Sequence, residues 1–139
     1  MPSVKLIFLD GVYEGSSYEG KVLNGKFHGN GTLCNKEGHK FEGMWNRGIR
    51  HGAGKYTYEN SESYEGEYQN GIRNGFGVYT YKNGDEEHGL WVDGKPRGEH
   101  EYIKGNPNED DMTTPLRLTR NWAQGNSFSA RLRKFFRAN

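Results

Sequence analysis

The stretch "YEGEYQNGIRNGFGVYTY", residues 64–81, places the dipeptide Asn70-Gly71 between two segments in which aromatic residues and glycines alternate with other residues. Asn-Gly is a strong signal for a two-residue β-hairpin turn, because both turn positions need a positive φ. Side chains alternate between the two faces of a strand, so one face of this hairpin should collect the rings and glycines. That face would hold Tyr64, Gly66 and Tyr68 from the first strand and Gly75, Gly77, Tyr79 and Tyr81 from the second. The opposite face is mostly polar, with Glu65, Glu67, Val78, Thr80 and Lys82.

The same pattern recurs four times at a spacing of 23 residues, without insertion or deletion. The four repeats begin at Tyr18, Phe41, Tyr64 and Glu87, and 15 of the 21 glycines fall in register. Such a period predicts an elongated array in which each repeat is one hairpin and hairpin follows hairpin. A glycine offers no side chain, so a ring from a neighbouring strand can lie on its backbone. The sequence therefore predicts an all-β, single-layer antiparallel meander over residues 18–102, with residues 1–17 as a partial repeat or extra strand.

The repeated pattern resembles the MORN repeat (membrane occupation and recognition nexus), which has Tyr-Glu-Gly, an aromatic residue, Asn-Gly and then Gly-x-Gly. Repeat four departs from it, because Glu87 replaces the leading aromatic residue, His88 the acid and His100 the last glycine. These departures suggest a terminal, capping repeat. Similar repeats occur in radial-spoke head proteins of motile cilia, in protist cytoskeletal scaffolds, in junctophilins and beside the catalytic domain of plant phosphoinositide kinases. The resemblance implies a role in assembly and no catalysis by the repeats.

Composition agrees with a single domain that has an unusual core. The chain has 139 residues, of which 32% are hydrophobic and 14% aromatic, and its mean hydropathy is −1.05. A core built from these residues has to use Tyr, Trp and Phe more than Leu, Ile and Val. No run of about 18 apolar residues and no signal-peptide pattern is present, so we expect a cytosolic or cytoskeletal protein. Cys34 is a single cysteine and fits a reducing compartment as a small residue of the sheet.

The sequence contains no complete motif for the catalytic and cofactor sites that parts of it resemble. The stretch "GIRHGAGKYTY", residues 48–58, lacks the first glycine and the Ser or Thr of a phosphate-binding loop. His28 and His51 are equivalent repeat positions about 10 Å apart, too far for one zinc ion. The acidic cluster Glu109-Asp110-Asp111 lacks the alternating ligands of a calcium loop. We therefore expect no enzyme, no metal site and no cofactor.

Nucleic acid is also an unfavourable partner for the repeats. Interleaved aromatic residues and a basic tail could stack on bases. Residues 1–102, however, contain 12 basic and 15 acidic side chains, and acidic residues such as Glu19 and Glu65 repel phosphates. We expect no nucleic-acid binding.

The end of the chain differs in kind from the repeats. Residues 103–126 read as a linker rich in Gly, Asn, Pro and acid, and residues 112–139 contain six basic side chains and no acid. Residues 127–139 predict a short basic amphipathic helix with an N-cap at Ser127 and an apolar stripe at Phe128, Leu132, Phe135 and Phe136. Three roles stay open: packing over the aromatic surface of the sheet, docking into a partner protein, or contact with an anionic membrane.

These observations predict a non-enzymatic scaffold that presents a Tyr/Trp/Gly surface to protein partners, with self-association as a further option. An axonemal or cytoskeletal assembly is the expected setting, by analogy with small ciliary and cytoskeletal members of the family. The alternative is an adaptor that binds anionic phospholipids through its basic tail. The predicted partner-binding residues are Trp45, Tyr56, Tyr64, Tyr68, Tyr79 and Trp91 on the sheet, and Arg131, Arg133, Lys134, Phe135 and Phe136 in the tail.

Overall fold

Each 23-residue repeat forms one hairpin in the computed structural model, which describes residues 2–105, 117–121 and 131–133. A seven-residue strand, a two-residue turn and a nine-residue strand recur four times. The hairpins are β2 (Ser17–Leu23) with β3 (Lys26–Cys34), β4 (Lys40–Asn46) with β5 (Ile49–Thr57), β6 (Ser63–Gln69) with β7 (Ile72–Thr80), and β8 (Glu86–Val92) with β9 (Lys95–Ile103). At the N-terminal end lie β1 (Ser3–Ile7) and the short 3-10 helix η1 (Gly11–Tyr13).

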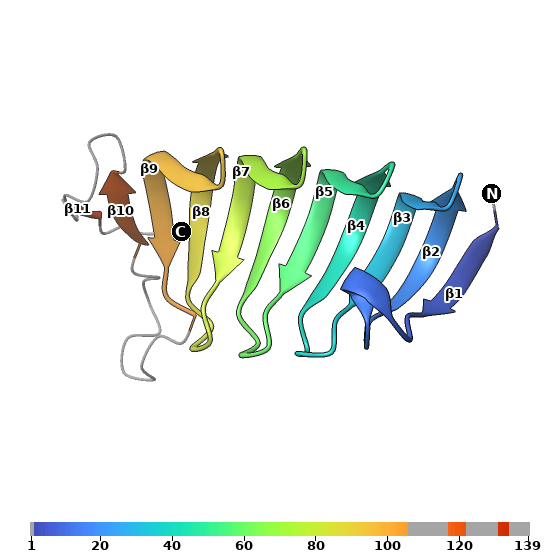
Figure 1. The fold of residues 1–139 in the computed structure, drawn as a ribbon. Helices are drawn as coiled ribbons and strands as arrows, with labels where there is room; N and C mark the ends of the chain where they lie inside the picture. The colour runs from blue at the N-terminus through green and yellow to red at the C-terminus, as the bar shows by residue number, and fades with distance from the viewer. Residues whose placement is uncertain (1, 106–116, 122–130, 134–139) are drawn as a thin grey trace.

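The described strands lie side by side in chain order as one open antiparallel sheet (Figure 1). Contacts between strands join consecutive neighbours, as expected for an array whose units meet only the next unit. The predicted all-β antiparallel meander is confirmed. Among the residues that the structure covers, no helix is long and apolar enough to cross a bilayer.

The C-terminal helix predicted over residues 127–139 lies mostly outside the described residues. The three of its residues that are described, Arg131–Arg133, form strand β11 and no helix. This strand pairs with β10 (Arg117–Asn121), which pairs in turn with β9 and falls in the segment predicted as a linker. The edge of β9 offers unpaired backbone donors and acceptors, whereas so short a helix is marginal in water. Strand pairing gives the residues of β10 backbone partners on both sides and those of β11 on one side.

The hairpin turns have the geometry that their dipeptides predict. Asn24, Arg47, Asn70 and Asp93 have φ between 49° and 51°, and the glycine after each also has a positive φ. The last three of these turns each donate a backbone hydrogen bond to the hairpin before, from Gly48 N to Phe27 O, Gly71 N to Arg50 O and Gly94 N to Arg73 O. These bonds tie successive repeats together along one edge of the sheet, which we call the turn edge.

One assignment of residues to faces was wrong. Gly75 shares sequence parity with Gly77 and Tyr79, but a Cβ built on Gly75 would meet the side chain of Glu67, on the opposite face. The cause is a β-bulge, since Gly66 pairs with Gly77 while Tyr68 pairs with Arg73. Gly75 lies inside the bulge at φ 122°, where the backbone turns away from the regular alternation.

The N-terminal segment covers the first repeat. Phe8 precedes η1, and Tyr13 is the last residue of η1. Both rings pack against Phe27, with centroid distances of 6.0 and 5.4 Å. Leu6 and Phe8 add partly buried apolar surface to the core of the sheet. The aromatic surface of repeat one is thus partly closed by the chain itself, while the later repeats have no such cover among the described residues.

Candidate functional site

The core of the protein is a row of rings on one face of the sheet, which we call the aromatic face. In repeat three the ring of Tyr64 lies over Gly66 and Gly77, where any Cβ would overlap it. Phe41 lies in the same way over Gly54, and Tyr18 over Gly31. These leading rings are almost completely buried by a single sheet, because the paired glycines let them lie flat on the backbone.

A second set of rings locks each repeat to the one before it. Trp45, Tyr68 and Trp91 stand edge-on to the leading rings Tyr18, Phe41 and Tyr64, with centroid distances of 6.2, 5.1 and 5.1 Å. Edge-to-face contacts of this kind stabilise aromatic pairs beyond their buried area. Four residues predicted to bind a partner therefore lie in the buried floor of the aromatic face: Trp45, Tyr64, Tyr68 and Trp91.

A third row consists of partly exposed tyrosines on the second half of repeats two to four. Neighbouring rings follow one another at 4.8, 6.1, 4.8 and 5.7 Å. This tyrosine row contains Tyr56, Tyr58, Tyr79, Tyr81 and Tyr102. Tyr56 and Tyr79 were predicted to bind a partner, and they lie in this accessible row. The other three were missed, although their 23-residue spacing was visible in the sequence.

Two carboxylates hold the tyrosine row at the other edge of the sheet, which we call the loop edge. Glu62 accepts hydrogen bonds from the Tyr79 hydroxyl and from the backbone N–H of Lys82. Asp85, 23 residues later, accepts from the Tyr102 hydroxyl at 2.6 Å and from the N–H of Gly105. These bonds lower the pKa of both carboxyl groups, with the bond from Asn60 the largest contribution at Glu62 and that from Tyr102 the largest at Asp85. Burial raises the pKa of Tyr79 to about 12.

Two arginines lie on the aromatic face near the turn edge. The guanidinium carbon of Arg50 is 5.3 to 5.4 Å from the ring centroids of Phe41, Tyr56 and Tyr68. Arg73, one repeat later, is 5.1 Å from the Tyr64 ring. Each donates to a backbone carbonyl of the following turn, Arg50 to Gly71 at 3.0 Å and Arg73 to Gly94 at 3.3 Å. Both arginines were missed as site residues, because the face was predicted to consist of tyrosine, tryptophan and glycine.

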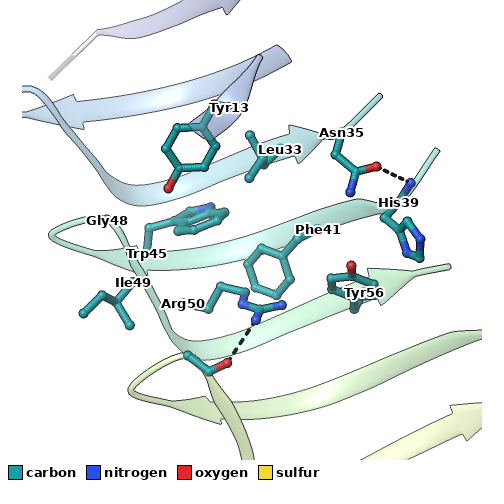
Figure 2. A pocket seen from close by; sticks show the side chains of 11 residues that line it. Tyr13, Leu33, Asn35, His39, Phe41, Trp45, Gly48, Ile49, Arg50 and Tyr56 are labelled. Carbon is teal, nitrogen blue, oxygen red and sulfur yellow. Dashed lines mark hydrogen bonds between the residues drawn. The ribbon is translucent and has the colours of Figure 1, made fainter. Parts of the chain in front are cut away.

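The aromatic face is hollowed over repeats one to three. A hollow of about 350 Å³ has Phe41, Trp45 and Arg50 at its floor, His39 and Tyr56 toward the loop edge, and Ile49 toward the turn edge (Figure 2). A second hollow of about 440 Å³ lies beside Phe8, Val22 and Phe27 and shares Tyr13 and Gly48 with the first. Together they form a ring-lined depression that another molecule can contact.

Repeat four builds its buried ring position from the opposite strand. Glu87 replaces the leading ring, and the His100 ring lies over Gly89 instead. His100 Nε2 is 2.8 Å from the carbonyl oxygen of Leu90, the same bond that the Tyr18 hydroxyl makes to Lys21 O in repeat one. Trp91 packs against His100 with centroids 4.6 Å apart. Glu87, itself buried, accepts from the Tyr81 hydroxyl at 3.0 Å.

The predicted tail residues lie in strand β11 or follow it in the sequence. Lys134, Phe135 and Phe136 lie outside the described residues, and Arg131 and Arg133 are known only as backbone partners of β10. Within the part of the chain that the structure describes, no group of three or more metal-ligating side chains comes together. The aromatic face offers a ring-lined depression together with the guanidinium groups of Arg50 and Arg73.

The family model for the MORN repeat matches residues 18–39, 41–63 and 64–86. These ranges cover the first three hairpins, and the hairpin of β8 and β9 follows them with the same strand lengths. MORN repeats are non-enzymatic and occur in scaffolds that bind proteins or membranes. A comparison with curated proteins gave no match.

Proposed function

Because the chain is a MORN-repeat protein, we propose that it is a non-enzymatic scaffold whose aromatic face binds a protein partner in a larger assembly. The observation that carries this proposal is the tyrosine row beside Arg50 and Arg73. Tyrosine and arginine are enriched where proteins bind one another, because each combines a flat apolar body with hydrogen-bonding groups.

The packing of the face supports the same function. The buried rings hold the floor rigid, and the carboxylates of Glu62 and Asp85 fix the tyrosine hydroxyls Tyr79 and Tyr102 from the loop edge. A preorganised surface loses little conformational entropy when a partner binds. Binding of a partner therefore requires no movement of the sheet.

We further propose that this assembly belongs to the axoneme of cilia or to the cytoskeleton. The proposal rests on the resemblance of the repeats to those of radial-spoke head and cytoskeletal scaffolds, which is an analogy. A second candidate is an adaptor on anionic membranes. The six basic and no acidic side chains of residues 112–139 favour it.

The test is affinity purification of the tagged full-length chain from its native cells, beside the variant Tyr56→Ser/Tyr79→Ser. The matched control is Phe76→Ser, which removes a ring that is 75% exposed on the opposite face. We expect axonemal or cytoskeletal proteins to be retained by the original chain and the control and lost with the double variant. Retention of the same partners by all three chains would contradict the proposal.

A truncation after Pro115 separates the second candidate from the first. If the membrane function is correct, the full-length chain binds anionic vesicles in a salt-dependent way and the truncated chain does not. Equal partner capture by both chains, without vesicle binding by either, would leave the tail no role in membrane attachment.

A further inference from the structure

We infer that the segment of the partner that occupies the aromatic face is an α-helix with two carboxylates seven residues apart. This inference rests on the proposed function and specifies the chemistry of the partner. It follows from the charge and spacing of Arg50 and Arg73 and from the position of the tyrosine row.

Neither guanidinium group forms an ion pair with an acidic side chain of the described residues. Among the described residues, ion pairs join Lys40 to Glu42 and two histidines to neighbouring glutamates, and none includes Arg50 or Arg73. Each arginine stacks on rings and donates to one carbonyl. A guanidinium has five N–H donors, and its preferred acceptor is a carboxylate. Both side chains are partly exposed and can meet a carboxylate from outside.

The distance between the two cations sets the spacing of the groups that can bind both. Arg50 belongs to β5 and Arg73 to β7, at equivalent positions two strands apart. Neighbouring strands are spaced by about 4.8 Å, so the two sites repeat at about 10 Å along the sheet. A partner that meets both must present its carboxylates at this spacing.

A spacing of about 10 Å matches an α-helix and not an extended strand. Residues seven apart on an α-helix lie on one face and are separated by about 10.5 Å along its axis. An extended strand offers residues of one face at about 6.8 or 13.6 Å, neither of which matches. The residues three and four positions after the first carboxylate lie between the two carboxylates on the same face, where apolar side chains would cover the rings of Tyr56 and Tyr79.

The charges at the two edges also orient the helix. Glu62, Asp85 and Glu87 line the loop edge and accept hydrogen bonds from Tyr79, Tyr102 and Tyr81. A carboxylate of the partner is repelled at that edge and attracted to Arg50 and Arg73 near the turn edge. The acidic flank of the helix therefore faces the turn edge.

The test is a selection from a displayed library of amphipathic helical peptides, with the full-length chain as bait. Positions on one side of the helix sample Glu, Lys, Gln, Leu and Tyr. We expect enriched peptides to share two glutamates seven residues apart with leucine or tyrosine between them. Their affinity should fall roughly tenfold for Arg50→Gln/Arg73→Gln and with rising salt.

The control is Arg97→Gln, which removes an exposed cation on the opposite face, where Arg97 pairs with Leu90. Its affinity should stay within about twofold of the original, since it leaves the aromatic face intact. The charge-keeping variant Arg50→Lys/Arg73→Lys should retain more affinity than the glutamine variant. A glutamine variant that loses its fold is replaced by this lysine pair and by the salt series on the unchanged protein.

The outcomes separate the inference from the proposed function. Peptides that lose affinity with Tyr56→Ser/Tyr79→Ser but lack the acidic pair would overturn the inference and leave the proposed function standing. Enriched peptides that ignore both tyrosines and both arginines would overturn both. Competition by phosphatidylserine vesicles that depends on Arg50 and Arg73 would assign these cations to a lipid headgroup and overturn the helix.

Discussion

Repeats three and four solve one packing problem from opposite strands. In repeat three the ring comes from the first strand, as Tyr64, and lies over Gly66 and Gly77. In repeat four the first strand has Glu87, and the ring comes from the second strand, as His100 over Gly89. Both rings are 0% exposed, and a tryptophan or tyrosine packs edge-on to each.

The two arrangements share the packing that a repeat of this kind requires. One ring lies over the backbone of the glycine-containing strand pair, and a second ring packs edge-on to it. The first ring can come from either strand of the pair. His100 also reproduces the hydrogen bond that Tyr18 donates to the carbonyl of Lys21, through its contact with Leu90 O. In repeat four the facing strand therefore supplies the ring that the first strand lacks, and the aromatic floor continues to β9.

The largest expected effect comes from His100→Gly, which removes the ring of repeat four and leaves a cavity beside Trp91. We expect a loss of about 3 kcal/mol in the free energy of unfolding. The double variant Glu87→Tyr/His100→Gly restores the arrangement of repeat three and should recover most of this loss. Urea unfolding of the three chains is the measurement. A double variant as unstable as the single one would show that the two arrangements are not equivalent.

The next effect comes from crowding the glycine pair of repeat three. Gly77→Ala places a Cβ within the ring of Tyr64, so we expect a loss of about 2 kcal/mol. Gly98→Ala has open space around its Cβ but a φ of 70°, so it should cost only about 1 kcal/mol. Thermal unfolding compares the two variants. Equal losses would contradict the prediction that contact with the Tyr64 ring costs more than backbone strain at Gly98.

A smaller effect distinguishes two leading tyrosines. The Tyr18 hydroxyl donates to Lys21 O at 2.7 Å, whereas the buried Tyr64 hydroxyl has no hydrogen-bond partner among the described residues. Tyr18→Phe should therefore cost about 1 kcal/mol, and Tyr64→Phe should be neutral or slightly stabilising. Repeat two already has phenylalanine in this position, as Phe41. Calorimetry of both variants gives the comparison, and a costly Tyr64→Phe would contradict it.

The smallest expected effect is a dependence on pH at the loop edge. Hydrogen bonds lower the pKa of Asp85 in the folded chain, so its contribution to stability is present above the unfolded value of about 4 and is lost as pH falls through the folded value. Asp85→Asn should therefore flatten the loss of stability as the pH falls below about 4. Unfolding curves across this range are the measurement, and an unchanged slope would contradict the assignment.

The sequence predicted the hairpins because the turn chemistry is local. Asn24, Asn70 and Asp93 precede glycines, and no long-range contact is needed to read them. In the sequence, the transfer of the ring to the second strand of repeat four appeared only as departures from the pattern at Glu87 and His100. Which residues face one another across two strands depends on the register, and the repeat pattern alone does not define it. The orientation of Gly75 was predicted wrongly because a bulge changes the face of a residue without changing the spacing of the repeat.

The candidate site was only partly predictable, for a different reason. Alternation assigns Trp45, Tyr56, Tyr68 and Tyr79 to one face, but it does not say which rings lie beneath the others. Burial of Trp45 and Tyr68 and exposure of Tyr56 and Tyr79 follow from the stacking of neighbouring hairpins. Arg50 and Arg73 occupy the position of Phe27 in repeat one, and this equivalence was a signal that could have identified them.

The most direct test of the account is an NMR titration of the tyrosine ring resonances with the partner obtained by affinity purification. The account predicts that the signals of Tyr56, Tyr58, Tyr79, Tyr81 and Tyr102 shift, while those of the buried Tyr18, Tyr64 and Tyr68 change little. Shifts at Phe76 on the opposite face, with the tyrosine row unchanged, would contradict the claim that the aromatic face is the binding surface.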